Sequence, residues 1–138
     1  MVTYHEKHPI AVADLTDLYN RVLWTAYTDY PEKMAKLLPG SLWHLAALDD
    51  EKLVGIIRVV GDDSSILYIQ DICVDPDYQR QGIGTALVGR TLNHFSHIRQ
   101  SVLVTDNDPK TMSFYRSLGM APIEEVGGVC FVRYQKGV

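Results

Sequence analysis

The sequence has few cysteines and no sign of a metal site. Its 138 residues include two cysteines, Cys73 and Cys130, which lie far apart and belong to no Cys-x-x-Cys pair. This usage argues against the disulfide framework of a small secreted domain. We therefore expect two buried thiols in a reducing compartment and no bound metal.

Long hydrophobic runs and concentrated positive charge are also missing. No stretch of about 18 apolar residues is present, and residues 1–10 lack the apolar core of a signal peptide. We expect no membrane association and a cytoplasmic location. The net charge of -4, with both signs scattered along the chain, argues against a nucleic-acid partner. Since no repeat or linker interrupts the sequence, a single domain over residues 1–138 is expected.

What is present is an alternation of strand and helix patterns. Apolar spacing and the positions of proline and glycine predict the order β-α-α-β-β-β-α-β-α-β-β. This order favours an α/β fold, with a mixed and mostly antiparallel sheet flanked by about four helices. The expected strands are 2–4, 42–48, 53–60, 66–74, 101–105, 123–126 and 129–134, the last two forming a hairpin. The expected helices are 14–30, 31–38, about 82–95, and 108–118.

A glycine-containing loop lies where the fourth predicted strand passes into the third predicted helix. Its sequence is Gln79-Arg80-Gln81-Gly82-Ile83-Gly84. A helix N-terminus offers unpaired N–H groups and partial positive charge, glycines allow close backbone approach, and Arg80 can add a charged hydrogen bond. The loop is therefore a candidate pyrophosphate site. The Walker pattern is missing, and a dinucleotide fingerprint would need glycine at Leu87. A plain glycine turn is the remaining alternative.

Two segments carry a resemblance to a known family. Residues 69–78 followed by Gln79–Gly84 resemble the strand and acyl-CoA loop of the GNAT N-acetyltransferase superfamily, whose pattern is [RQ]-x-x-G-x-[GA]. Residues 114–120, Phe-Tyr-Arg-Ser-Leu-Gly-Met, are similar to that family's Phe-Tyr-x-x-Leu-Gly-Phe segment. The predicted element order is the family's over nearly the whole chain. The resemblance implies an acetyl-CoA-dependent N-acetyltransferase.

The resemblance also implies which residues hold acetyl-CoA. A bulge or splay in the strand would free backbone N–H groups to bind the pantetheine arm and the acetyl carbonyl, so the identity of the Cys73 side chain matters little. Asp108 stands where relatives often have a cofactor-contacting asparagine, but it is equally well explained as a helix N-cap. The full set of expected contacts is Ile72, Cys73, Val74, Gln79, Arg80, Gln81, Gly82, Ile83, Gly84, Thr85 and Asp108.

Two catalytic residues are expected by the same resemblance. Tyr115 matches the family's tyrosine and would protonate the departing thiolate; the alternative is that it only packs. An alkyl amine is neutral in roughly one molecule in 2,500 at pH 7, a cost of about 4.6 kcal/mol, so a base is needed. Asp71, a charge in an apolar strand, is the candidate, with a structural role as the alternative. An acyl-carrying role for Cys73 is disfavoured.

The acceptor is less well defined by the sequence. A small-molecule amine is the first hypothesis. Transfer to a protein amine is the second, and a CoA-binding regulatory module without turnover is the third. The aromatic residues Trp24, Tyr27, Tyr30 and Trp43 lie in regions that shape the acceptor site in this family, although such residues more often belong to a core or interface. A small chain with spare aromatic residues is also a candidate for homodimer formation.

Overall fold

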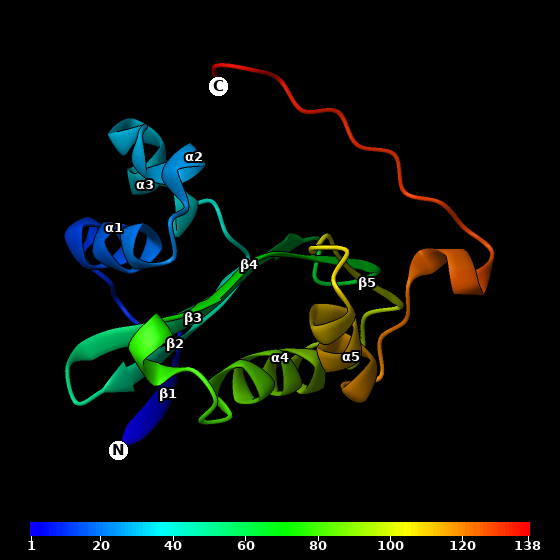
Figure 1. Ribbon diagram of the computed structural model, residues 1–138, viewed down its shortest axis with the longest axis horizontal. Helices are drawn as coiled ribbons and strands as arrows, with labels where there is room; N and C mark the ends of the chain where they lie inside the picture. The colour runs from blue at the N-terminus through cyan, green and yellow to red at the C-terminus, as the bar shows by residue number, and fades with distance from the viewer. The chain divides into compact units, whose positions relative to one another are not determined.

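The computed structural model describes residues 1–138, which group into two compact units, residues 1–104 and 105–138. The first unit is built on one five-stranded sheet (Figure 1). Its strands lie in the order of the chain: β1 (Val2–Glu6), β2 (Trp43–Asp49), β3 (Lys52–Gly61), β4 (Ile66–Val74) and β5 (Gln100–Leu103). Neighbours are antiparallel except for the parallel pair β4–β5. The predicted mixed, mostly antiparallel sheet is therefore confirmed.

Helices cover both faces of this sheet. One face carries α1 (Val12–Arg21), α2 (Thr25–Thr28) and α3 (Pro31–Leu37), and the other carries α4 (Ile83–His94) (Figure 1). On the first face, Leu15, Leu18 and Tyr19 pack in one buried cluster with the strand residues Ile56 and Cys73. This burial of apolar surface is the main force that holds α1 on the sheet.

The opposite face depends on close approach of α4 to β3. A Cβ atom added to Gly55 would lie 3.2 Å from Cγ2 of Ile83 and 3.3 Å from the carbonyl oxygen of Cys73. A side chain at this point would press on the first turn of α4, which would have to move by a few tenths of an ångström. Ile83, Leu87 and Val88 are fully buried along the helix, so its N-terminal end is firmly attached to the sheet.

The predicted helix over residues 14–30 is wrong in one respect, because it is broken at Leu23. α1 ends in a left-handed turn at Leu23 (φ 63°), where the N–H of Trp24 donates to the carbonyl of Tyr19 at 2.9 Å. The break folds Trp24 and Tyr27 back onto Tyr19, and the three rings contact one another with centroids 5.0–6.1 Å apart. These tertiary contacts outweigh the cost of a left-handed leucine.

The second unit contains α5 (Pro109–Ser117) and a short 3₁₀ helix, η2 (Ile123–Val126). Asp108 caps α5, because its carboxylate accepts from the N–H of Thr111 at 3.1 Å, and Pro109 occupies the first helical position. Gly119 follows the helix with φ 86°. The predicted start and stop of this helix are confirmed. No helix in the structure has both the length and the hydrophobicity needed to cross a bilayer.

The predicted C-terminal hairpin is not formed. Residues 123–126 turn as η2, since Gly127 (φ 89°) and the nearby Gly128 allow the chain to wrap around Ile123. Residues 129–134 have no regular secondary structure and no strand partner. The expectation of two buried thiols is also half wrong: Cys73 is buried, whereas Cys130 in this segment is exposed.

The contact between Gly55 and Ile83 gives a prediction about stability. Replacing Gly55 with valine should displace the first turn of α4 and lower the free energy of unfolding by about 1–3 kcal/mol. Urea denaturation followed by circular dichroism measures this change. Gly89, within the same helix, has no atom within 4 Å of an added Cβ, so Gly89→Ala should stabilise by up to about 1 kcal/mol. Equal stability of Gly55→Val and the parent chain would contradict the packing.

Candidate active site

Strand β4 is both bulged and partly unpaired. Arg58 of β3 is opposite Asp71 whereas Val59 is opposite Ile69, so Gln70 is the extra residue of a β-bulge. The parallel partner β5 pairs only with Ile66–Ile69, although β4 continues to Val74. The sequence suggested a bulge or splay near Ile72–Val74. The structure has both features, with the bulge two residues before Ile72, and the edge of residues 70–74 toward β5 has no strand beside it.

The loop after β4 ends in an open helix N-terminus. Gly82 is the N-cap of α4 with φ 79°, a conformation that favours glycine, and no side chain caps this end of the twelve-residue helix. The first intrahelical bond runs from the N–H of Ala86 to Gly82 O at 3.0 Å. The N–H groups of Ile83, Gly84 and Thr85 precede it and suit an anion. Residues 79–82 are exposed, so no side chain of the loop fills the site.

A buried aspartate fixes the turn that leads into this loop. Asp75 is 1% exposed, and its carboxylate accepts from the N–H of Asp77 at 2.9 Å. The same carboxylate forms ion pairs with Nε of Arg21 at 3.0 Å and Nζ of Lys52 at 3.8 Å. The hydroxyl of Tyr78 donates to Asp49 at 2.7 Å. The turn is thereby tied to α1 and to the β2–β3 hairpin. In the sequence, Asp75-Pro76 stands directly after the predicted strand 66–74, and no functional role was predicted for it.

Asp71 lies in a buried cluster of polar side chains. Its Oδ2 accepts from Nε of Arg58 at 2.5 Å and from the hydroxyl of Tyr19 at 2.9 Å, and its Oδ1 accepts from the hydroxyl of Tyr27 at 2.6 Å. Gln70 Nε2 and Arg58 donate to the Tyr27 oxygen at 3.1 and 3.3 Å. Three of the roughly four acceptor positions of the carboxylate are therefore occupied. A structural role was the predicted alternative for Asp71, and the hydrogen-bond partners of its carboxylate are the side chains of Arg58, Tyr19 and Tyr27.

Burial and the charge of Asp71 keep the donors of this cluster protonated. Desolvation, followed by the charge of Asp71, raises the pKa of both Tyr19 and Tyr27. Burial opposes the charge of Arg58, but the contact with Asp71 raises its pKa above the usual value. Desolvation, with Asp71 as a second cause, also raises the pKa of the Cys73 thiol. A thiol held protonated is a poor nucleophile, which agrees with the low weight given to an acyl-carrying role.

Tyr115 and Asp108 lie in the second unit. Tyr115 is half-buried on α5, and desolvation raises the pKa of its phenol above 10.0, with a smaller opposing effect from a hydrogen bond to Thr105. The phenol is therefore protonated at neutral pH, as a general acid must be. The carboxylate of Asp108 accepts from both the N–H and the hydroxyl of Thr111, so the N-cap interpretation of this residue is confirmed. Its contact with acetyl-CoA stays a prediction.

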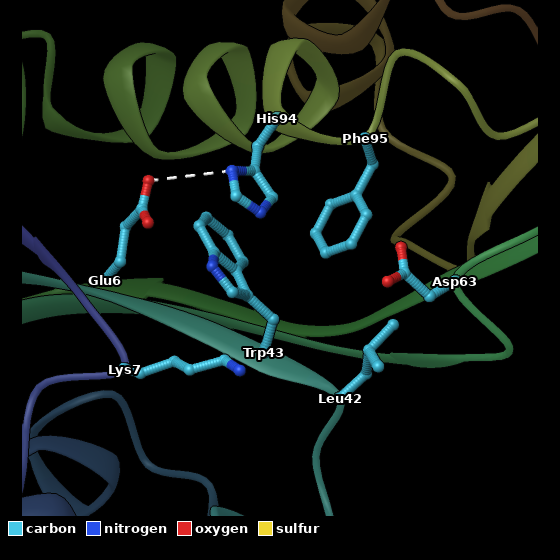
Figure 2. A pocket seen from close by; sticks show the side chains of 7 residues that line it. All are labelled: Glu6, Lys7, Leu42, Trp43, Asp63, His94 and Phe95. Carbon is cyan, nitrogen blue, oxygen red and sulfur yellow. Dashed lines mark ion pairs between the residues drawn. The ribbon is translucent and has the colours of Figure 1, made fainter.

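The aromatic residues expected near an acceptor are divided between the two faces of the sheet. Trp24 and Tyr27 lie with Tyr19 on the face covered by α1–α3. Trp43 instead packs against α4, where its ring stacks on His94 at 4.8 Å. It lines a pocket of about 300 Å³ together with His94 and Phe95 (Figure 2), and the lining includes neither Asp71 nor its three donors. Tyr30 is covered by the ammonium group of Lys33 at 4.8 Å.

Sequence reasoning missed Arg58, Tyr19 and Asp75. Arg58 interrupts an apolar run, Leu53–Val60, as Asp71 interrupts its own. The same argument about buried charge that selected Asp71 would have selected Arg58, and the opposite signs would have suggested an ion pair. Tyr19 had no such signal, because its helical spacing identifies it only as a core residue.

Comparison with known proteins agrees with this arrangement. The family model described as "Acetyltransferase (GNAT) family" matches residues 9–120. An uncharacterized N-acetyltransferase ycf52 of Gracilaria tenuistipitata var. liui is 28% identical over 111 residues, covering 77% of this chain and 59% of that protein. The histone acetyltransferase TAP1 of Glycine max is 31% identical over 71 residues, covering 51% of this chain and 31% of that protein. The chain thus spans less than two thirds of the length of each of these two curated relatives.

A solved structure covers the whole chain. The GNAT family acetyltransferase SP0256 from Streptococcus pneumoniae TIGR4 has a TM-score of 0.87 at 33% sequence identity, with 99% of each chain covered. The likeness therefore extends over both compact units of the present chain.

The Asp71 cluster gives a prediction about stability. Replacing Arg58 with methionine leaves a buried carboxylate without its counter-charge, and the free energy of unfolding should fall by about 3–5 kcal/mol. Chemical denaturation measures the loss. The control is Arg116→Met, because the ion pair of Arg116 with Glu125 is exposed and its removal should leave the unfolding midpoint nearly unchanged. Equal effects of the two substitutions would show that the buried pair carries no special weight.

Proposed function

Because the chain belongs to the acetyltransferase (GNAT) family, we propose that it transfers the acetyl group of acetyl-CoA to a primary amine of a small molecule. The observation that carries the proposal is the order of the secondary-structure elements along residues 70–85. A strand with an open edge is followed, after the exposed loop 79–82, by a helix whose N-terminus no side chain caps. The first offers backbone hydrogen bonds to an extended chain, and the second offers them to a diphosphate. No metal ion has a part in the proposal.

The cofactor half of the site is assigned mainly to backbone groups. N–H groups of Ile72–Val74 bind the pantetheine arm and polarise the acetyl carbonyl. Those of Gln81–Thr85 bind the diphosphate, with Gln79 and Arg80 beside them. Asp108 contributes a further contact. This assignment is supported by the exposure of residues 79–82 and by the absence of a capping side chain.

The chemical step is direct attack of the neutral amine on the thioester. A C–N bond forms, the C–S bond breaks, and the developing oxyanion is stabilised by the backbone N–H groups of β4. Tyr115 donates its proton to the departing sulfur. The raised pKa of Tyr115 keeps the proton in place until the thiolate forms. The amine must lose one proton in the same sequence, so a base is required.

Asp71 has two candidate roles in this step. As the base, it would receive the amine's proton through Tyr27, whose half-buried hydroxyl already donates to Oδ1. As a positioning residue, it would hold α1 and α2 against β4 and leave the proton to water. The three occupied acceptor positions favour positioning. Asp71→Asn distinguishes the roles, because loss of a base removes turnover without lowering acceptor affinity, whereas loss of positioning weakens acceptor binding and stability together.

The proposed class of acceptor is argued from side chains on the face of the sheet that α1–α3 cover. Tyr27 contacts Gln70 and Asp71 in the open part of β4, and the ring of Trp24 lies 6.1 Å from that of Tyr27. An aromatic pair of this kind suits a small amine, and the net charge of -4 does not oppose a cation. The soybean relative is named a histone acetyltransferase, and that name favours a protein amine as the second candidate. The free thiols fit the cytoplasm as the place of action.

A panel of amines tests the activity. Purified protein is incubated with acetyl-CoA and small polyamines, amino sugars, amino acids or lysine-containing peptides, and released CoA thiol is measured. The exposed thiol of Cys130 reacts with the same reagents, so a Cys130→Ser chain serves as the enzyme. Acetyl-CoA that binds without turnover above background hydrolysis would favour the regulatory module and contradict acetyl transfer.

The role of Tyr115 gives the first functional prediction. Tyr115→Phe should lower kcat by about a hundredfold or more, because a general acid contributes roughly 10²–10⁴-fold, and should leave acetyl-CoA affinity nearly unchanged. Steady-state kinetics and calorimetric titration separate the two quantities. Tyr134→Phe, at an exposed tyrosine of the same unit, is the control. Unchanged kcat in Tyr115→Phe would remove this residue from the acid role.

The loop gives the second functional prediction. Gly82→Val should weaken CoA binding at least about tenfold, because valine does not adopt φ 79° without strain and the N–H groups would turn away. Gly127→Val is matched, since Gly127 has φ 89° and, like Gly82, open space around an added Cβ. Calorimetric titration with CoA should show the loss in the first variant alone. Equal affinities would contradict a diphosphate site at this loop.

A further inference from the structure

The loop proposed to hold the diphosphate has few anchors of its own. Asp75 and Ile83 are buried, and every residue between them is exposed except the half-buried Tyr78. Arg80 and Gly82 both have positive φ, 65° and 79°, so the backbone turns sharply twice within three residues. A segment with few buried contacts is readily displaced, and its conformation depends on its two ends. Asp75 forms the first of these ends.

Asp75 connects the loop to the interior of the first unit. Its N–H donates to the carbonyl of Val54 at 2.8 Å, and its Oδ1 accepts from the N–H of Asp77 at 2.9 Å. The other carboxylate oxygen, Oδ2, is buried and accepts no hydrogen bond. Two cations face it instead, Nε of Arg21 at 3.0 Å and Nζ of Lys52 at 3.8 Å. Because a buried charge is costly without compensation, this oxygen depends on its counter-ions.

Arg21 is the nearer of the two cations and the last residue of α1. Its Nη2 donates to the carbonyl of Leu53 at 3.1 Å, so the guanidinium is fixed between β3 and Asp75. The side chain of Lys52 is 50% exposed, and water screens its charge. The ion pair with Arg21 is therefore the main counter-charge of Asp75, and it joins the loop to the C-terminal end of α1.

The end of α1 leads at once to the aromatic residues of the proposed acceptor side. Leu23 follows with its left-handed φ of 63°, and the N–H of Trp24 bonds back to the carbonyl of Tyr19. The rings of Tyr19, Trp24 and Tyr27 pack against one another. Because only two residues separate Arg21 from Trp24 and the rings are closely packed, a displacement of Arg21 also moves this cluster.

We propose that Asp75 and Arg21 are positioning residues, which couple occupancy of the diphosphate loop to the geometry of the turn formed by residues 22–28. A diphosphate that orders residues 79–85 also restrains Asp75, and the ion pair extends this restraint to the end of α1. Coupling of this kind is reciprocal, so an occupied acceptor side favours cofactor binding. The inference rests on the proposed function, since it takes the loop as the diphosphate site.

Amide hydrogen exchange with a truncated cofactor tests the coupling. The probe is 3′-phospho-ADP, the part of coenzyme A that carries the diphosphate and lacks the pantetheine arm. Saturating probe should slow exchange in residues 22–28 by about fivefold or more, the lower end of typical couplings between sites. In Arg21→Gln the probe should slow exchange in residues 79–85 but no longer in residues 22–28. Arg21→Lys keeps the charge and should restore most of the effect.

Tyr78→Phe is the matched control. It removes the 2.7 Å hydrogen bond from the loop to Asp49 and leaves the contacts of Asp75 in place, so the probe should still slow exchange in residues 22–28. Loss of the effect in this variant would assign it to the loop as a whole and contradict a role of the ion pair. Circular dichroism should show all three variants folded.

The outcomes separate this coupling from the proposed function. A parent chain that binds the probe with no change in residues 22–28 overturns the coupling and leaves the proposed function standing. An Arg21→Gln chain that retains the full change has the same meaning. A parent chain that binds neither the probe nor coenzyme A contradicts the diphosphate site itself, and overturns the coupling as well.

Discussion

The carboxylate of Asp71 accepts hydrogen bonds from three different elements of the chain, and the arrangement of the proposed acceptor side depends on it. Arg58 comes from β3, Tyr19 from α1 and Tyr27 from α2. A charge buried to this degree is stable only when it is paired and hydrogen-bonded, so the three donors are constrained as tightly as the acceptor. The position of α2 over β4 is therefore set by electrostatics as well as by apolar packing. The aromatic contacts of Tyr19 with Trp24 and Tyr27 reinforce the same geometry.

The β-bulge at Gln70 makes this burial compatible with an open strand edge. Without the bulge, Ile69 and Asp71 would face the same side of the sheet, because side chains alternate along a strand. With the bulge, Ile69 pairs with Val59 and lies on the same face as Val59. Asp71 pairs with Arg58 and lies on the face covered by α1. β5 leaves β4 at the same point, after Ile69. One local irregularity thus places a charged cluster on one face and coincides with the start of a free backbone edge.

Features of the structure that depend on neighbouring residues in the sequence were predicted well. Features that depend on contacts between distant residues were not. Asp108 acts through a side-chain cap three residues away, Pro109 through its fixed backbone angle, and Gly82 and Gly119 through a positive φ, and each lies at the predicted helix end. The turn at Leu23 depends on rings that meet only in the folded chain, so helical spacing alone continued the helix through it. The segment 129–134 has the composition of a strand but forms no regular secondary structure, because composition alone does not supply a strand partner. Tyr19 was recognisable as buried and not as a hydrogen-bond donor.

The same distinction explains why the residues proposed to bind the cofactor were easier to predict from the sequence than those proposed to bind the acceptor. Coenzyme A is expected to be held by backbone N–H groups, and backbone can approach a diphosphate closely only where side chains are small. That requirement is visible in the amino-acid sequence as a few glycines at fixed spacing. The acceptor is expected to meet side chains of α1 and α2, which any residue of suitable size can supply. The arrangement of those side chains depends on Asp71, Arg58 and Tyr27 together. These residues come from three segments far apart in the chain, so no single stretch of the sequence predicts the arrangement.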